Sequence, residues 1–258
     1  MPICPVPTAG KRPVTVGIWQ HFPLPMVSRL LARLGWDWVI VDMQHCSANT
    51  ETVYECVHTL STAGATPLVR TSIGAPAEVQ RALDLGARGV IVPMVNSLAE
   101  ARAMAQAAKY PPRGCRSVGS DAAWHYGADY YERANDETLL LVQVEHIDAV
   151  TQVEEIMALD GVDGCFIGPT DLALSMGLPR TGYEEHEQHR AAIARTLAAC
   201  QASGKLACCN TYSLADFAEK VQLGFDCITL RSEADLFYSA AGELLAQARE
   251  VAGQPRPK

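Results

Sequence analysis

The sequence predicts a single-domain α/β protein, a (β/α)8 barrel of the TIM type. The chain has 258 residues, which is close to the ~250 residues that one such barrel uses. Eight short apolar runs alternate with longer amphipathic segments, and six of those segments end at a glycine, a common C-terminal signal of a helix. Because no GxGxxG or GxxxxGK[ST] motif is present, the pattern favours a closed barrel over an open nucleotide-binding sheet.

The predicted strands are rich in β-branched residues and almost continuously apolar, as parallel strands are when both of their faces are buried. The barrel should occupy residues 14–252, after an extension of residues 1–13 and before a frayed tail of residues 253–258. In chain order, the strands are expected at Val14–Trp19, Trp38–Asp42, Thr66–Arg70, Gly89–Val92, Thr138–Val144, Gly164–Ile167, Lys205–Cys208 and Cys227–Leu230.

Segments with the 3.6-residue apolar period of helices lie between and after these strands. The last of them carries an apolar stripe that could cover this chain's own barrel or a partner subunit. The stretch Tyr110–Asn135 is too long for a simple connection, so it either is functional or carries an extra helix that packs its aromatic residues over the end of the barrel. The helices are expected at Pro25–Leu34, Asn49–Ala63, Ala75–Leu85, Leu98–Ala108, Val150–Leu159, Tyr183–Cys200, Ser213–Leu223 and Ser232–Val251.

Composition excludes several classes of protein. Lysine and arginine total 21 against 29 aspartate and glutamate residues, and this net charge of −8 leaves no basic footprint for nucleic acid. No apolar run reaches the ~18–20 residues that span a membrane, and the N-terminal residues lack the apolar stretch of a secretory signal. The nine cysteines are odd in number and lack CxxC or zinc-finger spacing, so we expect reduced, buried thiols in a cytoplasmic protein.

Polar side chains gather at the predicted C-terminal ends of the strands, where barrel enzymes carry their active sites. An arginine, candidate carboxylates and a histidine are therefore expected to converge at one end of the barrel. The side chains at or just after these strand ends are Trp19, Gln20, His21, Asp42, Gln44, His45, Arg70, Gln143, Glu145, His146, Thr170 and Asp171.

Two of these residues suggest a metal site. Glu145 and Asp171 suit an oxygen-preferring divalent ion such as Mg²⁺ or Mn²⁺; alternatively, Glu145 is a solvated strand-end charge and Asp171 caps a short helix. Arg70 could likewise form only an ion pair with a carboxylate, and His45 could be a hydrogen-bonded loop residue. Asp84 falls late in the third helix, so its spacing places it at the opposite end of the barrel.

Six segments identify a family: WVIVDMQH (38–45), TPLVR (66–70), RALDLGARGVIVPMV (81–95), YPPRGCRSVG (110–119), QVEHIDAV (143–150) and DGVDGCFIGPTDLALSMG (160–177). They resemble the HpcH/HpaI family of metal-dependent class II pyruvate aldolases. The resemblance extends over nearly the whole chain, from about Val14 to Leu230. Its most specific parts are the GPTDL motif and the upstream QVE and PPRG motifs.

The resemblance implies a role for each matching residue. Glu145 and Asp171 would be the protein ligands of a divalent metal, Mg²⁺, Mn²⁺ or Co²⁺. Gln143 would support the metal-bound substrate. The backbone N–H groups of Thr170 and Asp171 would bind the substrate carboxylate. Arg70 would stabilise the enolate oxygen.

The resemblance also implies that His45 is the base and that Asp84 raises its basicity, a role that spacing does not predict. If His45 is not the base, His21 is the next candidate. We expect Trp19, His21 and Trp124 to line the side of the pocket that receives the aldehyde.

The chain departs from the family pattern at two positions. Gln44 precedes the histidine where the family often has glutamate, a change that leaves the base intact. His146 follows the metal glutamate where a small polar residue is common, so the surroundings of the metal or the acceptor pocket could differ. The segment Ser120–Asn135 is the least similar to the family, and acceptor specificity could differ there.

Aldol chemistry on pyruvate needs a stabilised carbanion, which either a lysine imine or a metal can provide. None of the five lysines is predicted at the C-terminal end of a strand, so we expect a metal-dependent aldolase acting on a small 2-oxo acid and an aldehyde. One alternative is a decarboxylase or carbon–carbon bond former acting on oxaloacetate, as macrophomate synthase does. Another is a non-catalytic barrel that binds small acids. The resemblance further implies a homo-oligomer, a hexamer built as a trimer of dimers that exchange the last helix.

Overall fold

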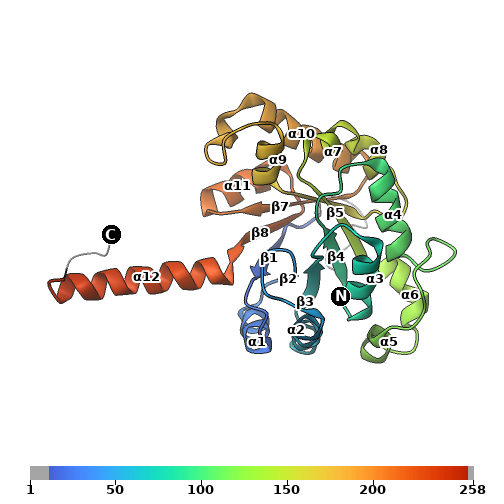
Figure 1. Cartoon of the computed structure of the whole chain (residues 1–258), viewed down its shortest axis with the longest axis horizontal. Helices are drawn as coiled ribbons and strands as arrows, with labels where there is room; N and C mark the ends of the chain where they lie inside the picture. Colours follow the sequence, from blue (N-terminus) through green and yellow to red (C-terminus); the bar gives the residue numbers. More distant parts are fainter. Residues whose placement is uncertain (1–11, 255–258) are drawn as a thin grey trace.

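The computed structural model describes residues 12–254, and its centre is a closed barrel of parallel strands (Figure 1). Each strand pairs with the next one in sequence, and the last strand pairs with the first. The predicted fold class is therefore confirmed. The strands are β1 (Thr15–Gln20), β2 (Trp38–Asp42), β3 (Thr66–Arg70), β4 (Gly89–Val92), β5 (Leu139–Val144), β6 (Gly164–Ile167), β7 (Leu206–Thr211) and β8 (Cys227–Ser232).

Helices surround the barrel, and their ends carry the expected local signals. Asn49 and Ser232 form capping boxes at two helix starts, and the left-handed residues Gly35 and Gly224 end two others. The helices are α1 (Pro25–Leu34), α2 (Thr50–Thr62), α3 (Pro76–Asp84), α4 (Leu98–Ala108), α5 (Asp121–Tyr126), α6 (Tyr130–Glu137), α7 (Ile147–Thr151), α8 (Val153–Met157), α9 (Pro169–Ser175), the 3₁₀ helix η1 (Tyr183–Glu185), α10 (Glu187–Ala202), α11 (Leu214–Leu223) and α12 (Glu233–Val251).

Apolar cores lie on both faces of the strands. On the outer face, strand residues pack against the helices in one large cluster. A Cβ at Gly17 would lie 2.5 Å from the indole ring of Trp38, so glycine is required for this ring to fill the barrel. The inner face contributes Trp19, Trp38, Ile40, Leu68, Ile91, Leu141, Phe166, Leu206, Cys208 and Cys227.

The structure corrects several predicted boundaries. β7 ends at Thr211 rather than Cys208, and β8 ends at Ser232 rather than Leu230. The apolar runs stop earlier because residues at the C-terminal end of the barrel are polar while the backbone pairing continues, as between Thr211 and Leu230. The predicted helix over 150–159 is also divided into α7 and α8.

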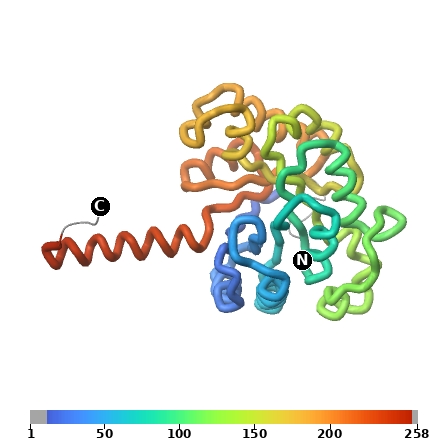
Figure 2. The backbone as a smooth tube through the Cα atoms, viewed as in Figure 1, coloured from blue at the N-terminus to red at the C-terminus, as the bar shows by residue number. Residues whose placement is uncertain are grey.

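The aromatic stretch after α4 packs at the N-terminal end of the barrel, whereas the role expected for Trp124 required the C-terminal end. It forms α5 and α6, which Figure 2 shows in light green at the edge of the molecule. The hydroxyl of Tyr126 donates to the carbonyl of Gly86 at 2.7 Å, and its ring lies 4.1 Å from the guanidinium carbon of Arg88. Because both partners directly precede β4, these aromatic residues cover the N-terminal end of the barrel.

The last helix, α12, projects away from the barrel instead of packing on it (Figure 1). Glu233, its first residue, is its one buried residue. Its apolar stripe therefore does not cover this chain's own barrel. The predicted extension 1–13 and tail 253–258 fall mostly outside the described residues. Within residues 12–254, none of the helices is long and apolar enough to cross a membrane.

Candidate active site

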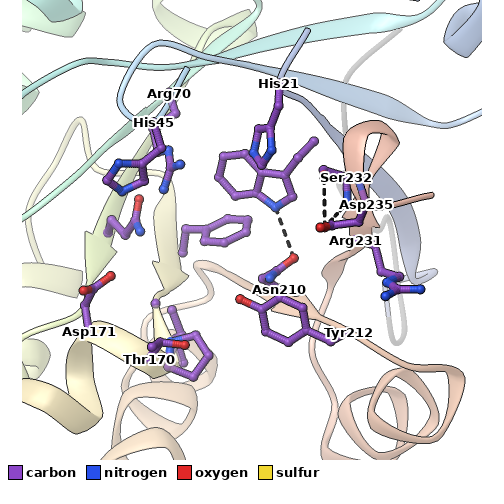
Figure 3. A pocket seen from close by; sticks show the side chains of 16 residues that line it. His21, His45, Arg70, Thr170, Asp171, Asn210, Tyr212, Arg231, Ser232 and Asp235 are labelled. Carbon is purple, nitrogen blue, oxygen red and sulfur yellow. Dashed lines mark hydrogen bonds between the residues drawn. The ribbon is translucent and has the colours of Figure 1, made fainter. Parts of the chain in front are cut away.

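A cavity of about 210 Å³ opens at the C-terminal ends of the strands, where barrel enzymes bind their substrates. Most of the predicted site residues meet there, and Figure 3 shows this cavity from close by. The predicted residues that line it are Trp19, His21, His45, Arg70, Gln143, Thr170 and Asp171.

Asp42, at the end of β2, holds Arg70 at the end of β3. The Nε and Nη2 atoms of Arg70 donate to the two carboxylate oxygens at 2.8 and 2.7 Å, and the strand register places the two residues side by side. Burial pushes the pKa of Asp42 upward, but the hydrogen bonds and charge of Arg70 outweigh it and hold this pKa below its ordinary value. Nη1 of Arg70 makes no hydrogen bond to the described chain, so this atom remains available to a substrate.

Trp19 forms an apolar wall of the cavity beside this ion pair. Its Nε1 donates to Oδ1 of Asn210 and to Oγ1 of Thr229, both at 3.1 Å. The ring meets Phe166 edge to face at 5.4 Å, and the guanidinium carbon of Arg70 lies 4.4 Å from its centroid. These contacts fix the orientation of the indole. The cavity therefore has a rigid apolar wall beside the polar Asp42–Arg70 ion pair.

Glu145 follows β5 and lies next to Gln143 and Gly168 of the cavity wall. Its Oε1 accepts a hydrogen bond from the Met94 N–H at 2.8 Å, and its Oε2 accepts one from Nε2 of Gln143 at 2.6 Å. Burial raises the pKa of Glu145 to about 7 against the opposing effect of the Met94 hydrogen bond, and the charge of Asp171 adds to the rise. A carboxylate destabilised in this way gains from a nearby cation.

These residues fit an oxygen-preferring divalent cation. Glu145 and Asp171 supply carboxylates, and the buried Oε1 of Gln143 has no hydrogen-bond partner within residues 12–254. A Cβ at Gly168 would lie 2.6 Å from Oε2 of Glu145, so glycine leaves the room this side chain needs. Residues 12–254 contain no group of three or more His, Cys, Asp or Glu side chains that could hold a metal, so substrate and water would have to complete the coordination.

Thr170 and Asp171 lie in the first turn of α9, which follows β6 directly. The hydroxyl of Thr170 is 3.2 Å from the hydroxyl of Tyr183, a contact that ties this turn to the next segment of the chain. The backbone N–H groups of Thr170 and Asp171 have no partner in the described chain. Free N–H groups at the start of a helix suit a carboxylate.

Two histidines line the cavity. His45 lies in the loop after β2, beside Arg70 in Figure 3, and its ring makes no hydrogen bond within residues 12–254. His21 follows β1, and its Nε2 lies 3.6 Å from Oδ2 of Asp42. Among the described residues, the histidine of this cavity that lies within 4 Å of a carboxylate is therefore His21, not the predicted base His45.

Three predicted or singled-out residues lie elsewhere in this chain. Asp84, the last residue of α3, accepts a hydrogen bond from Arg116 at 2.7 Å and does not line the cavity, as its spacing predicted. Trp124, on α5, is 90% exposed and borders a separate cavity, so within this chain it is not part of the acceptor wall. The ring of His146 accepts the Asp148 N–H and caps α7, a structural role.

The sequence reasoning missed the wall that β7, β8 and α12 supply. Asn210, Tyr212, Arg231, Ser232 and Asp235 all line the cavity. They were missed because both strands were predicted too short, although polar residues directly after the apolar runs could have indicated them. Arg231 is distinctive, since its backbone is left-handed (φ 59°) and its buried Nε has no hydrogen-bond partner among the described residues.

Fold and site together define a (β/α)8-barrel enzyme with an arginine and two carboxylates at the C-terminal end of the barrel. The model of the HpcH/HpaI aldolase/citrate lyase family matches residues 16–232. The chain therefore belongs to the HpcH/HpaI family, as its motifs predicted, and the predicted enzyme class, a carbon–carbon lyase, is confirmed.

Its relatives include enzymes of several bacteria. The hydroxypyruvate/pyruvate aldolase of Rhizorhabdus wittichii is 36% identical over 241 residues, which cover 93% of this chain and 96% of that enzyme. The 4-hydroxy-2-oxo-heptane-1,7-dioate aldolase of Escherichia coli is 36% identical over 194 residues, which cover 74% and 73%. The crystal structure of an HpcH/HpaI aldolase/citrate lyase family protein from Burkholderia cenocepacia has a TM-score of 0.85 at 30% identity and covers 92% of this chain and 95% of its own.

Proposed function

We propose that this chain is a metal-dependent aldolase that forms or cleaves the carbon–carbon bond between a pyruvate-type 2-oxo acid and an aldehyde. Pyruvate and hydroxypyruvate are the proposed donors. The observation that carries the proposal is the meeting of Arg70, Gln143 and Asp171 at one cavity, with Glu145 hydrogen-bonded to Gln143 beside it. The activities named for the relatives agree with it.

The donor acid is held by charges and free N–H groups. Glu145 and Asp171 would hold a divalent ion such as Mg²⁺, Mn²⁺ or Co²⁺, which would act as a Lewis acid toward the keto group of the donor. Arg70 stabilises the oxygen that becomes negative, through the Nη1 that Asp42 leaves free. The N–H groups of Thr170 and Asp171 bind the carboxylate.

His45 is the proposed base on the donor side. It lines the cavity beside Arg70, and its ring is not committed to a hydrogen bond within the described chain. It can therefore take a proton from the carbon next to the ketone. The role that the resemblance gives Asp84 has no supporting contact within one chain, because Arg116 engages that carboxylate.

The positions of the lysines argue against a covalent imine. Lys109 is buried and donates to two carbonyl oxygens and to Asp163. Lys205 donates to carbonyl groups in the loop before β6, and Lys220 pairs with Asp216. None of these three lines the cavity, and the other two lysines lie outside the described residues.

The proposal is tested by the first half of the reaction. In deuterated water, the enzyme should exchange the methyl protons of pyruvate, followed by NMR, and a chelator should stop the exchange until metal is returned. His45→Ala should abolish exchange, whereas His58→Ala, outside the cavity, should not. Full exchange in metal-free buffer would contradict the metal-dependent mechanism.

The second half of the reaction, the addition to an aldehyde, identifies the acceptor substrate. A panel of aldehydes with pyruvate or hydroxypyruvate should yield aldol products. Turnover of oxaloacetate without exchange of pyruvate protons and without any aldol product would instead favour the oxaloacetate-decarboxylating alternative, because the same enolate arises by loss of CO₂.

We further propose a homo-oligomer in which α12 packs on a second copy of the chain. Leu244 and Val251 of α12 are 69% and 90% exposed, and Met26 and Leu34 of α1 are each 75% exposed. Such uncovered apolar faces are typical of subunit interfaces. The hexamer implied by the resemblance is the expected stoichiometry, and the cytoplasmic location stays a prediction.

A further inference from the structure

His21 has no part in the proposed donor chemistry, yet the structure holds its backbone firmly at the cavity. The N–H groups of His21 and Phe22 both donate to the carboxylate of Glu233, the first residue of α12. Glu233 is buried, so this contact between the end of β1 and the start of α12 is shielded from water. The fold therefore fixes the residue from which the imidazole extends.

The imidazole itself is oriented but keeps its hydrogen-bonding capacity. Its Nε2 lies 3.6 Å from the carboxylate of Asp42, and its ring centroid lies 6.3 Å from that of Trp19. That separation from Asp42 is longer than a hydrogen bond, and neither ring nitrogen bonds to another group of residues 12–254. The side chain is 34% exposed, so solvent can exchange protons with it.

The position of the ring in the cavity indicates which substrate it serves. In Figure 3, His45 and Asp171 lie on one side, with the donor groups, and Asn210 and Tyr212 lie on the other. The His21 ring points into the space between them. An aldehyde that approaches the donor through this space would present its carbonyl oxygen to the His21 ring.

We propose that His21 is the catalytic residue that exchanges a proton with the carbonyl oxygen of the acceptor aldehyde. The proposal rests on the aldolase function proposed above and assigns a different proton to each histidine. His45 removes the proton from the donor carbon, and His21 supplies the one that the acceptor oxygen requires.

In the addition direction, the enolate carbon forms the new bond to the aldehyde carbon. The π electron pair of the aldehyde moves to its oxygen, which takes a proton from protonated His21 and leaves the ring neutral. Solvent then reprotonates the exposed ring. In cleavage, neutral His21 takes the hydroxyl proton, the C=O bond re-forms, the carbon–carbon bond breaks and its electron pair returns to the enolate.

Two reactions of the metal-loaded enzyme, proton exchange of pyruvate and addition to an aldehyde, distinguish a role of His21 toward the acceptor from a role toward the donor. His21→Gln should leave the exchange of pyruvate methyl protons within about 2-fold of wild type, because no aldehyde takes part in it. Addition to acetaldehyde should fall by about 10²–10⁴-fold, the usual contribution of a positioned acid. The loss should be smaller with trifluoroacetaldehyde, whose oxygen is less basic and needs the proton less.

Two matched variants complete the test. His45→Gln should lose exchange as well as addition, and His58→Gln, on α2 and outside the cavity, should change neither. A near-wild-type addition rate in His21→Gln, or a parallel loss of exchange and addition in a variant that is folded by circular dichroism, would overturn the role of His21. Absence of exchange and of aldol product in the wild type would reject the proposed function and this role with it.

Discussion

Glu145→Gln should make the metal-free protein more stable above neutral pH, although it removes a proposed metal ligand. The pKa of Glu145 is about 7 in the fold and 4.5 in its ordinary environment, so the folded state binds the proton more tightly than the unfolded state. The protonated Glu145 therefore stabilises the fold fully below pH 4.5, and this contribution is lost as the pH rises from 4.5 to about 7. Glutamine keeps the shape of the side chain and does not ionise.

The size of the effect follows from the two pKa values. A rise from 4.5 to about 7 is worth about 3 kcal/mol, since one pH unit corresponds to about 1.4 kcal/mol. The amides of the new glutamine and of Gln143 must reorient to replace the 2.6 Å hydrogen bond, which offsets part of this gain. We therefore expect the variant to be about 1–3 kcal/mol more stable than wild type at pH 8 in chelator, and nearly equal at pH 5.

Urea unfolding at fixed protein concentration, followed by the fluorescence of the four tryptophans, measures this difference at pH 5 and pH 8. Mg²⁺ should raise the stability of the wild type at pH 8, because a ligand that binds only the folded state stabilises it. It should have little effect on the stability of the variant, which lacks the Glu145 carboxylate. As a control, Glu154→Gln should not gain stability at pH 8. Glu154 is an exposed carboxylate whose hydrogen bonds from Arg195 lower its pKa to about 2.

A stability difference between wild type and Glu145→Gln that is the same at pH 5 and pH 8 would refute the reasoning. So would a variant that is less stable than wild type at pH 8 in chelator. Either result would mean that the carboxylate is ionised at little cost in the metal-free fold, and the burial argument for a cation beside it would fail.

Three other predictions address the arginine, the glycine and the last helix. Arg70→Lys should lose more than ~10-fold in rate, because an ammonium cannot keep both hydrogen bonds to Asp42 and also reach the substrate; a near-wild-type rate would leave only a structural ion pair. Gly168→Ala should weaken Mg²⁺ binding by about 10–100-fold in calorimetry, and unchanged affinity would show that Glu145 is not a ligand. Leu244→Glu should lower the mass in sedimentation, and an unchanged mass would mean that this part of α12 is not buried against a second copy.

The order of strands and helices could be predicted because it depends on local patterns. The strands Trp38–Asp42, Thr66–Arg70, Gly89–Val92 and Gly164–Ile167 have the predicted bounds. In these strands the hydrogen-bonded ladder ends within one residue of the end of the apolar run. The placement of Arg70, His45 and Asp171 at one cavity followed from topology, because parallel strands in a closed barrel bring their C-terminal ends together. Their individual chemical roles came from the family motifs.

The tertiary structure alone decided which groups touch. The pairing of Asp42 with Arg70, the burial of Glu145 beside Gly168 and the approach of His21 to Asp42 depend on contacts between residues far apart in sequence. A pattern in the chain predicts which way a strand residue faces, but not the distance to a side chain on another strand.

The same reason applies to the two helical segments whose place was left open or predicted wrongly. The period of α12 showed an apolar stripe but not what covers it, and the aromatic residues of α5 and α6 indicated packing but not at which end of the barrel. An amphipathic pattern predicts that one face of a helix is buried. The geometry of the whole chain determines which surface that face packs against.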